Sequence, residues 1–142
     1  MKLLVATDGS KYAMRAVRFA AKLAADSKSP GRITLISVHD DVALNHARQI
    51  VGRQAVDNYL RDLSEKDLSA ARKILDKAGV RHDMIIRTGH VAAEIAATAD
   101  KGGFDLIVVG SKGRSALGDL LIGSIARRVT ELANTPVLLV KK

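Results

Sequence analysis

Glycine and hydroxyl residues gather in two short segments, and the second of these also carries cations and is able to bind an anion. The first is Thr7-Asp8-Gly9-Ser10, and the second is Gly110-Ser111-Lys112-Gly113-Arg114-Ser115; each follows an apolar run of strand length. Backbone N–H groups in a glycine-rich turn can approach phosphate oxygens closely, and the N-terminus of a following helix adds its dipole. The segments therefore indicate phosphate binding, with purely structural glycine turns as the alternative.

These segments do not match the common nucleotide motifs. A Walker loop needs G-x-x-x-x-G-K-[ST], whereas here Lys112 precedes Gly113 and does not follow a second glycine. No G-x-G-x-x-G follows the first apolar run, so a dinucleotide-dependent dehydrogenase also loses support. No hydroxyl residue stands beside a recognisable general base, and we predict no catalytic residue.

The composition is that of one ordinary globular domain. The chain has 142 residues, of which 47% are hydrophobic and 27% are charged, so we expect a single domain over residues 1–142. Cysteine is absent, which excludes disulfides, thiolate metal sites and cysteine nucleophiles. No signal-like segment opens the chain and no run reaches about 18 apolar residues, so we expect a cytoplasmic protein without a membrane partner.

The charge is strongly basic. Lysine and arginine number 23 against 15 acidic residues, a net charge of +8, which favours anionic partners such as nucleotides, nucleic acid or acidic surfaces. A basic row of Lys11, Arg15, Arg18 and Lys22 recurs at helical spacing and would suit nucleic-acid phosphates. Aromatic residues make up only 3% of the chain, which leaves little material for base stacking. We therefore expect a solvated helix face, and rank nucleic acid below nucleotide.

Five aliphatic runs of strand length alternate with helical patterns. The runs cover residues 3–6, 33–38, 83–87, 105–109 and 137–140, and the helical patterns cover about 10–27, 54–77, 89–101 and 120–134. Apolar residues are nearly continuous within the runs, which is typical of parallel strands covered on both faces. Residues 39–53 are the least readable stretch, and we interpret them as a solvated loop.

This alternation predicts an α/β fold. Right-handed crossovers favour an open, doubly wound sheet of five parallel strands in the spatial order 3-2-1-4-5, with helices on both faces. In that order the chain reverses direction between the first and fourth strands, and ligands bind at the carboxyl ends of strands beside such a switch point. The two glycine-containing segments leave the first and fourth strands at this place.

The glycine spacing resembles a family signature. Gly110-x2-Gly113-x9-Gly123-Ser124 is similar to the G-2x-G-9x-G-[S/T] motif of the ATP-binding branch of the universal stress protein family. Val5-Ala6-Thr7-Asp8-Gly9-Ser10 resembles that family's first strand and acidic turn, and Asn134-Thr135-Pro136-Val137-Leu138-Leu139-Val140 resembles its closing strand. The resemblance covers the whole chain. It implies a Rossmann-like fold of the adenine nucleotide alpha hydrolase-like type and an ATP-binding regulator or sensor in the stress response, without fast catalysis.

The resemblance also implies roles for individual residues. Asp8 would contact the nucleoside part of the ligand or a bound Mg²⁺, and the backbone near Val38 would hold the adenine. The ribose and phosphates of ATP, ADP or AMP would lie on Gly110, Gly113, Gly123 and Ser124. Neighbouring residues complete the predicted nucleotide site: Ala6, Thr7, Ser111, Lys112, Arg114 and Ile125. Occupancy would order the loop over residues 110–124.

The family further implies a homodimer, commonly formed through the last strand. Val137–Val140 is an apolar strand whose open edge must be paired, covered or guarded, and Lys141 and Lys142 are alternative guards. The chain departs from the family in its basic charge, since members are more often acidic. It also departs at His90-Val91, where the family segment Gly-Asp/Asn-Pro-x-x-x-Ile has Asp or Asn followed by Pro. The basic charge leaves room for an additional anionic partner.

Several alternatives stay open. One is a slow Mg²⁺-dependent ATPase or phosphotransfer enzyme in which Asp8 binds the metal or positions a water, and another is a binding module that uses the basic row. Asp8 also suits a purely local capping role.

We expect Asp105 to be structural, because it stands at the start of its strand and so lies at the end of the sheet away from the ligand. His39, Asp40, Asp41 and His46 match no recognised metal spacing, and His82 and His90 have no evident partners.

Overall fold

One sheet of five parallel strands organises the molecule. The computed structural model describes residues 1–26, 28–113 and 122–141. The strand order is β3-β2-β1-β4-β5, and all neighbouring strands run parallel, so the predicted doubly wound topology is confirmed. The strands are β1 (Lys2–Ala6), β2 (Arg32–Asp40), β3 (Arg81–Gly89), β4 (Leu106–Gly110) and β5 (Val137–Val140).

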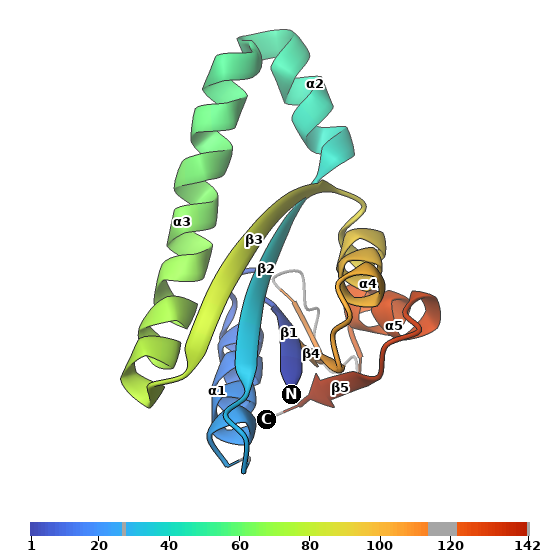
Figure 1. Ribbon diagram of the computed structural model, residues 1–142. Helices are drawn as coiled ribbons and strands as arrows, with labels where there is room; N and C mark the ends of the chain where they lie inside the picture. The colour runs from blue at the N-terminus through green and yellow to red at the C-terminus, as the bar shows by residue number, and fades with distance from the viewer. Residues whose placement is uncertain (27, 114–121, 142) are drawn as a thin grey trace.

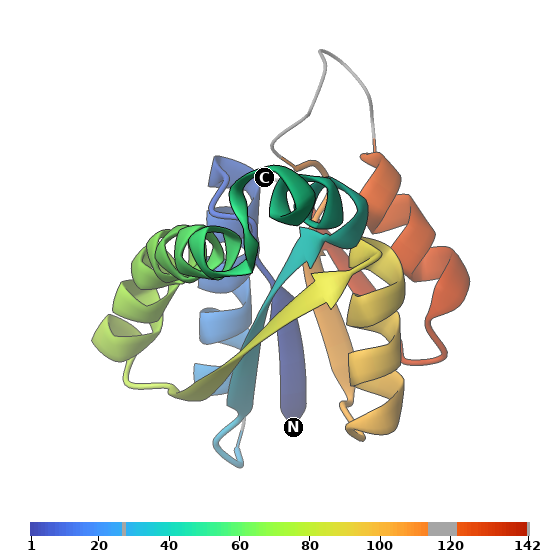
Figure 2. The ribbon, with the colours of Figure 1, turned by 90° about the horizontal axis from the view of Figure 1, so that it is seen from above.

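Helices cover both faces of this sheet, as Figures 1 and 2 show. On one face lie α1 (Lys11–Ala25) and α3 (Arg53–Ala78), and on the other lie α4 (Val91–Lys101) and α5 (Ser124–Leu132). Successive strand side chains alternate between the two apolar layers: Leu3 and Val5 pack toward α1 and α3, whereas Leu4 packs toward α4 and α5. Because both layers are buried, the apolar residues of the strands are nearly continuous in sequence.

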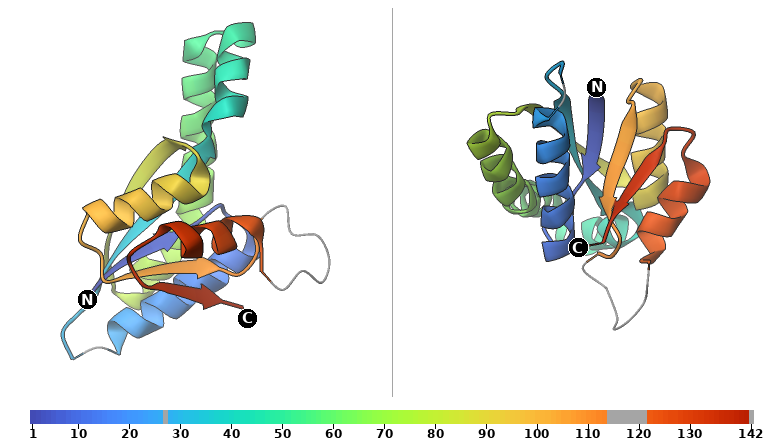
Figure 3. Two further views of the ribbon diagram at one scale, coloured as in Figure 1. Left: turned by 90° about the vertical axis from the view of Figure 1, so that its right-hand side faces the viewer. Right: turned by 90° about the horizontal axis from the view of Figure 1, so that it is seen from below.

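Residues 39–53 form no loop, so that expectation is wrong. β2 continues to Asp40, whose Oδ1 accepts a hydrogen bond from Val42 N at 2.9 Å and so caps α2 (Asp41–Val51). Gly52, at φ +90°, turns the chain directly into α3. The resulting α2–α3 hairpin projects beyond the sheet (Figure 3). Leu44 is the one α2 residue that is buried, and it packs against Val56 and Leu60 of α3.

The other element boundaries differ from prediction by a few residues. α3 ends near the expected place, where Gly79 adopts the left-handed conformation at φ +68° that commonly closes a helix. The last helix, α5, begins at Ser124 and not near residue 120. β3 pairs with β2 over nine register positions, from Arg81 to Gly89, because the long β2 provides a template for the whole edge strand.

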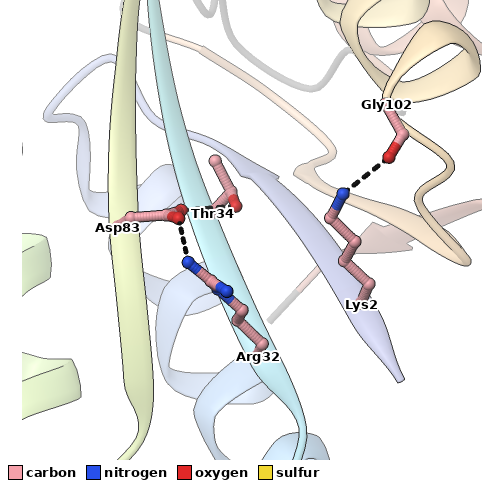
Figure 4. A network of polar contacts seen from close by, with 5 residues as sticks. All are labelled: Lys2, Arg32, Thr34, Asp83 and Gly102. Atoms are coloured by element: carbon pink, nitrogen blue, oxygen red, sulfur yellow. Dashed lines mark hydrogen bonds and ion pairs between the residues drawn. The ribbon is translucent and has the colours of Figure 1, made fainter.

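Polar contacts fix the amino end of the sheet (Figure 4). Lys2 Nζ donates to Gly102 O at 2.6 Å, and Lys2 N donates to Asp105 Oδ2 at 2.7 Å, so Asp105 has the structural role that its position predicts. Arg32 and Thr34 on β2 both donate to Asp83 on β3. The Thr34 hydroxyl is the main cause that lowers the pKa of Asp83, and the Arg32 guanidinium adds to it.

Candidate functional site

A pocket of about 590 Å³ opens at the carboxyl ends of β1, β2 and β4. This is the switch point at which doubly wound sheets hold ligands. The topology thus brings together segments that are more than 100 residues apart in the chain, as Asp8 and Gly113 show. Three residues that the sequence analysis singled out, Arg114, Ser115 and Lys142, lie outside the described residues. Residues of the predicted nucleotide site line the pocket: Ala6, Thr7, Asp8, Val38, Gly110, Lys112, Gly113, Gly123, Ser124 and Ile125.

The turn after β1 presents Asp8 to the pocket. Asp8 Oδ1 accepts a hydrogen bond from Ser10 N at 2.9 Å, and Ser10 Oγ accepts one from Ala13 N at 3.2 Å as the N-cap of α1. Gly9 adopts φ +78° between them. Asp8 therefore has the local turn role that its sequence position allows, and it also lines the pocket.

The three glycines of the motif meet different surroundings. A Cβ atom on Gly110 would lie 2.8 Å from the backbone oxygen of Tyr12, so this glycine lets α1 pass close to the end of β4. Among the described residues, a Cβ atom on Gly113 would meet only the Asp8 carboxylate, and one on Gly123 would lie 3.3 Å from Ser111 O and Lys112 Cα. Gly110 is therefore required for packing, whereas Gly113 keeps space open inside the pocket.

Ser111 is buried at the end of β4 and does not line the pocket. Ser111 N donates to Val140 O at 3.0 Å, and Ser111 O accepts from Gly123 N at 2.6 Å. These bonds join the end of β4 to β5 and to the start of α5. Ser111 therefore sets the position of the neighbouring pocket residues through its backbone.

The N-terminus of α5 faces the pocket. Gly123 is the N-cap and has no side chain to accept from the first turn, while Ser124, Ile125 and Ala126 line the cavity. The first N–H groups of a helix have no partner within it, and they carry the positive end of the helix dipole. Lys112 lines the same end of the pocket. This end of the pocket is suited to an anion.

The opposite end of the pocket offers a backbone edge. Thr7 N donates to Ile36 O at 3.0 Å, and Ile36 is the last β2 residue that is paired with β1, opposite Ala6. Backbone groups two residues apart on a strand point to the same side. The N–H and C=O of Val38 therefore face over the end of β1. The walls of the cavity beside them include Leu63, Val91 and Ile95.

A polar layer that the sequence did not reveal also borders the pocket. His39 Nε2 lies 2.7 Å from Ser64 Oγ of α3 and 3.4 Å from Ser37 Oγ. Asp67, one turn after Ser64, is 4% exposed and lines the cavity with Ser37 and His39. The sequence does contain one signal for this layer, because the polar residues Ser64 and Asp67 interrupt the apolar face of a long amphipathic helix.

The remaining candidate residues lie elsewhere. His82 has partners, contrary to expectation: its Nδ1 lies 2.8 Å from Val80 O and its Nε2 lies 3.3 Å from Asp76 Oδ1 across the Gly79 turn. His46 is exposed on α2. Across the described ranges 1–26, 28–113 and 122–141, no three His, Asp or Glu residues are grouped as metal ligands.

The basic row forms the outer face of α1. Lys11, Arg18 and Lys22 are exposed there, opposite the buried positions of the same helix. Lys11 and Arg15 flank the ring of Tyr12, with Nζ at 5.2 Å and Cζ at 5.6 Å from its centroid. No helix in the described part of the chain is both long and apolar enough to span a membrane.

Comparisons with known proteins agree on one family. The model of the universal stress protein family matches residues 1–141. Universal stress protein YxiE of Bacillus subtilis is 31% identical, and the match covers 99% of this chain and 98% of YxiE. The structure of MJ0577 of Methanocaldococcus jannaschii is 27% identical with a TM-score of 0.86, covering 99% of this chain and 95% of that one. A universal stress protein from Archaeoglobus fulgidus, solved in complex with dAMP, is 25% identical with a TM-score of 0.63, covering 99% and 98% of the two chains.

Proposed function

The chain belongs to the universal stress protein family, and we propose that it binds ATP or a related adenine nucleotide at the switch-point pocket and acts as a nucleotide-dependent regulator. The observation that carries the proposal is that the two ends of the pocket differ in their chemistry. Its β4–α5 end is suited to an anion, and its β2 end offers a backbone edge between apolar walls. The dAMP complex of the relative from Archaeoglobus fulgidus supports an adenine nucleotide as the ligand.

The phosphates would lie at the start of α5. Backbone N–H groups of Gly113, Ser124 and Ile125 would donate to phosphate oxygens, and the helix dipole and Lys112 would stabilise their charge. A Mg²⁺ ion on the phosphates would be held by the Asp8 carboxylate, since hard cations prefer oxygen ligands. The metal would neutralise charge between Asp8 and the phosphates.

The adenine would lie at the end of β2. Adenine presents an acceptor and a donor side by side, and the N–H and C=O of Val38 are a matching donor and acceptor. Leu63 from α3 and Val91 and Ile95 from α4 would cover the two faces of the ring. This placement leaves the ribose over β1, beside Asp8 and its neighbours.

The proposed role is binding and not rapid turnover. A bound nucleotide would bridge the β1 turn, the end of β2 and the start of α5, so occupancy would change how firmly these segments are held together. A ligand shifts a conformational equilibrium through such a difference in affinity between states. The Ser64 hydroxyl does contact the His39 imidazole, but Ser64 is fully buried and so is not accessible to a phosphate as a nucleophile.

Calorimetric titration of the purified protein with ATP, ADP and AMP, with and without Mg²⁺, tests this proposal. We expect saturable binding near one nucleotide per chain, and mass spectrometry should detect any nucleotide that co-purifies. An Asp8→Asn variant keeps an acceptor for Ser10 N, and it should lose the Mg²⁺-dependent part of the affinity. Absence of both binding and co-purified nucleotide would contradict the proposal, and release of ADP at a steady rate would favour the slow ATPase.

We also propose a homodimer through β5. β5 is an edge of the sheet, and Val137, Leu138 and Leu139 are only half-buried within one chain. Pro136 O and Val140 O accept bonds from β4 and the residue that follows it, so the alternation of a strand directs the N–H and C=O of Val137 and Leu139 outward. A second copy of the same strand would pair these groups and cover the apolar side chains.

A further inference from the structure

The α3 wall of the pocket is held to the end of β2 by a buried polar contact. His39 Nε2 and Ser64 Oγ are 2.7 Å apart, and Ser64 is fully buried. Ser37 Oγ lies 3.4 Å from the same ring nitrogen. This contact fixes the position of α3 relative to the backbone edge of Val38, which lies between Ser37 and His39 in β2.

Asp67 is placed by that contact. Residues three apart on a helix share a face, so Asp67 follows Ser64 toward the same sheet edge and lines the pocket while it is 4% exposed. A carboxyl group offers acceptor sites for several donors. At this end of the pocket it therefore favours a ligand group that donates a hydrogen bond.

We infer that Asp67 is a specificity-determining residue that accepts a hydrogen bond from the exocyclic 6-amino group of the base, so that the pocket selects adenine over 6-oxo purines. The inference rests on the proposed nucleotide-binding function and assigns its base specificity. The 6-amino group has two N–H donors, of which the Val38 carbonyl uses one. A 6-oxo group would instead place an acceptor against a buried carboxylate, and site groups left unpaired in this way discriminate strongly.

An isosteric substitution tests the inference. In an Asp67→Asn variant, the amide can turn its NH₂ group toward a 6-oxo oxygen. We therefore expect the ratio of the ITP and ATP dissociation constants to fall by about tenfold or more relative to the wild type, the equivalent of one hydrogen bond. Asp62→Asn is the matched control, because Asp62 is an exposed aspartate of the same helix, and it should leave the ratio unchanged.

The ratio does not depend on the fraction of folded protein, since both nucleotides are titrated into one preparation. Should Asp67→Asn fail to fold, Asp67→Ser replaces the carboxyl group with a smaller hydroxyl side chain. If the wild type binds ATP but the ratio in Asp67→Asn equals the wild-type ratio, the assignment of Asp67 is overturned and the proposed function stands. This includes the case in which the variant binds ATP and ITP more weakly by the same factor. A change in the preference for ATP over dATP instead would show that Asp67 reads the ribose, which also overturns it. A wild type that binds no nucleotide refutes the proposed function itself.

Discussion

A Cβ atom on Gly113 would lie 3.1 Å from Oδ2 of Asp8, so the Asp8 carboxylate borders the space in the pocket that a side chain at residue 113 would enter. A Gly113→Val variant should therefore fill this space and weaken ATP binding by at least about tenfold. The Asp8 side chain can rotate away, so the fold should persist. Calorimetry measures the affinity and thermal unfolding verifies the fold. Retained affinity in a folded variant would contradict the site.

Gly110 should respond in the opposite way. The Cβ atom of a Gly110→Ala variant would lie 2.8 Å from Tyr12 O and 2.9 Å from Tyr12 C, and backbone atoms cannot move aside as a carboxylate can. Overpacking of this kind costs about 1–3 kcal/mol. Urea denaturation should show this loss in the free energy of unfolding, and an unchanged midpoint would show that α1 can shift away from β4.

Acid should weaken the amino end of the sheet. The hydrogen bond from Thr34, with help from Arg32, lowers the folded-state pKa of Asp83. The stabilisation is therefore complete above the unfolded-state pKa of about 3.9 and disappears as the pH falls through the folded-state value. Because the side chains of this ion pair are about half exposed, we expect less than about 1 kcal/mol. The difference in unfolding free energy between the wild type and Asp83→Asn should be constant from about pH 7 to 5 and should shrink toward about pH 3.

The proposed dimer should depend on the outer edge of β5. The N–H of Leu139 is directed away from β4, so Leu139→Pro removes an intersubunit donor while the β4 ladder is preserved. Light scattering with size-exclusion chromatography should show a monomer that still binds ATP. Leu138→Pro is the contrasting variant, because it removes a donor that faces β4 and should lower the stability of the subunit. A dimer that survives Leu139→Pro would point to another interface.

The strand order and the position of the pocket could be predicted from sequence because they follow from local and chemical rules. Apolar runs such as Leu106-Ile107-Val108-Val109 mark buried parallel strands, and connections of fixed handedness leave few arrangements for them. The glycine spacing then identifies the segment at the switch point. None of these inferences needs the conformation of a particular side chain.

The features that sequence did not reveal depend on contacts between elements. α2 has a single buried residue, Leu44, and it packs on α3 through contacts with Val56 and Leu60. The contact between His39 and Ser64 joins residues 25 positions apart, and their partnership becomes visible only when α3 lies against β2. The role of Asp67 was hidden for the same reason. Its place on the helix can be predicted from the sequence, but the cavity that it lines cannot.

The central place of β1 has a consequence for the order in which the molecule can be completed. β1 is synthesised before the other four strands, yet one of its edges waits for β4, which begins at Leu106. The Asp8 turn therefore remains without its opposing segment through most of synthesis, and contacts of such long sequence separation form slowly. The pocket is completed late, since its last lining residue is Ala126, so a ligand that fits it can stabilise only chains that have grown past this point and should protect them from proteolysis in proportion to its affinity.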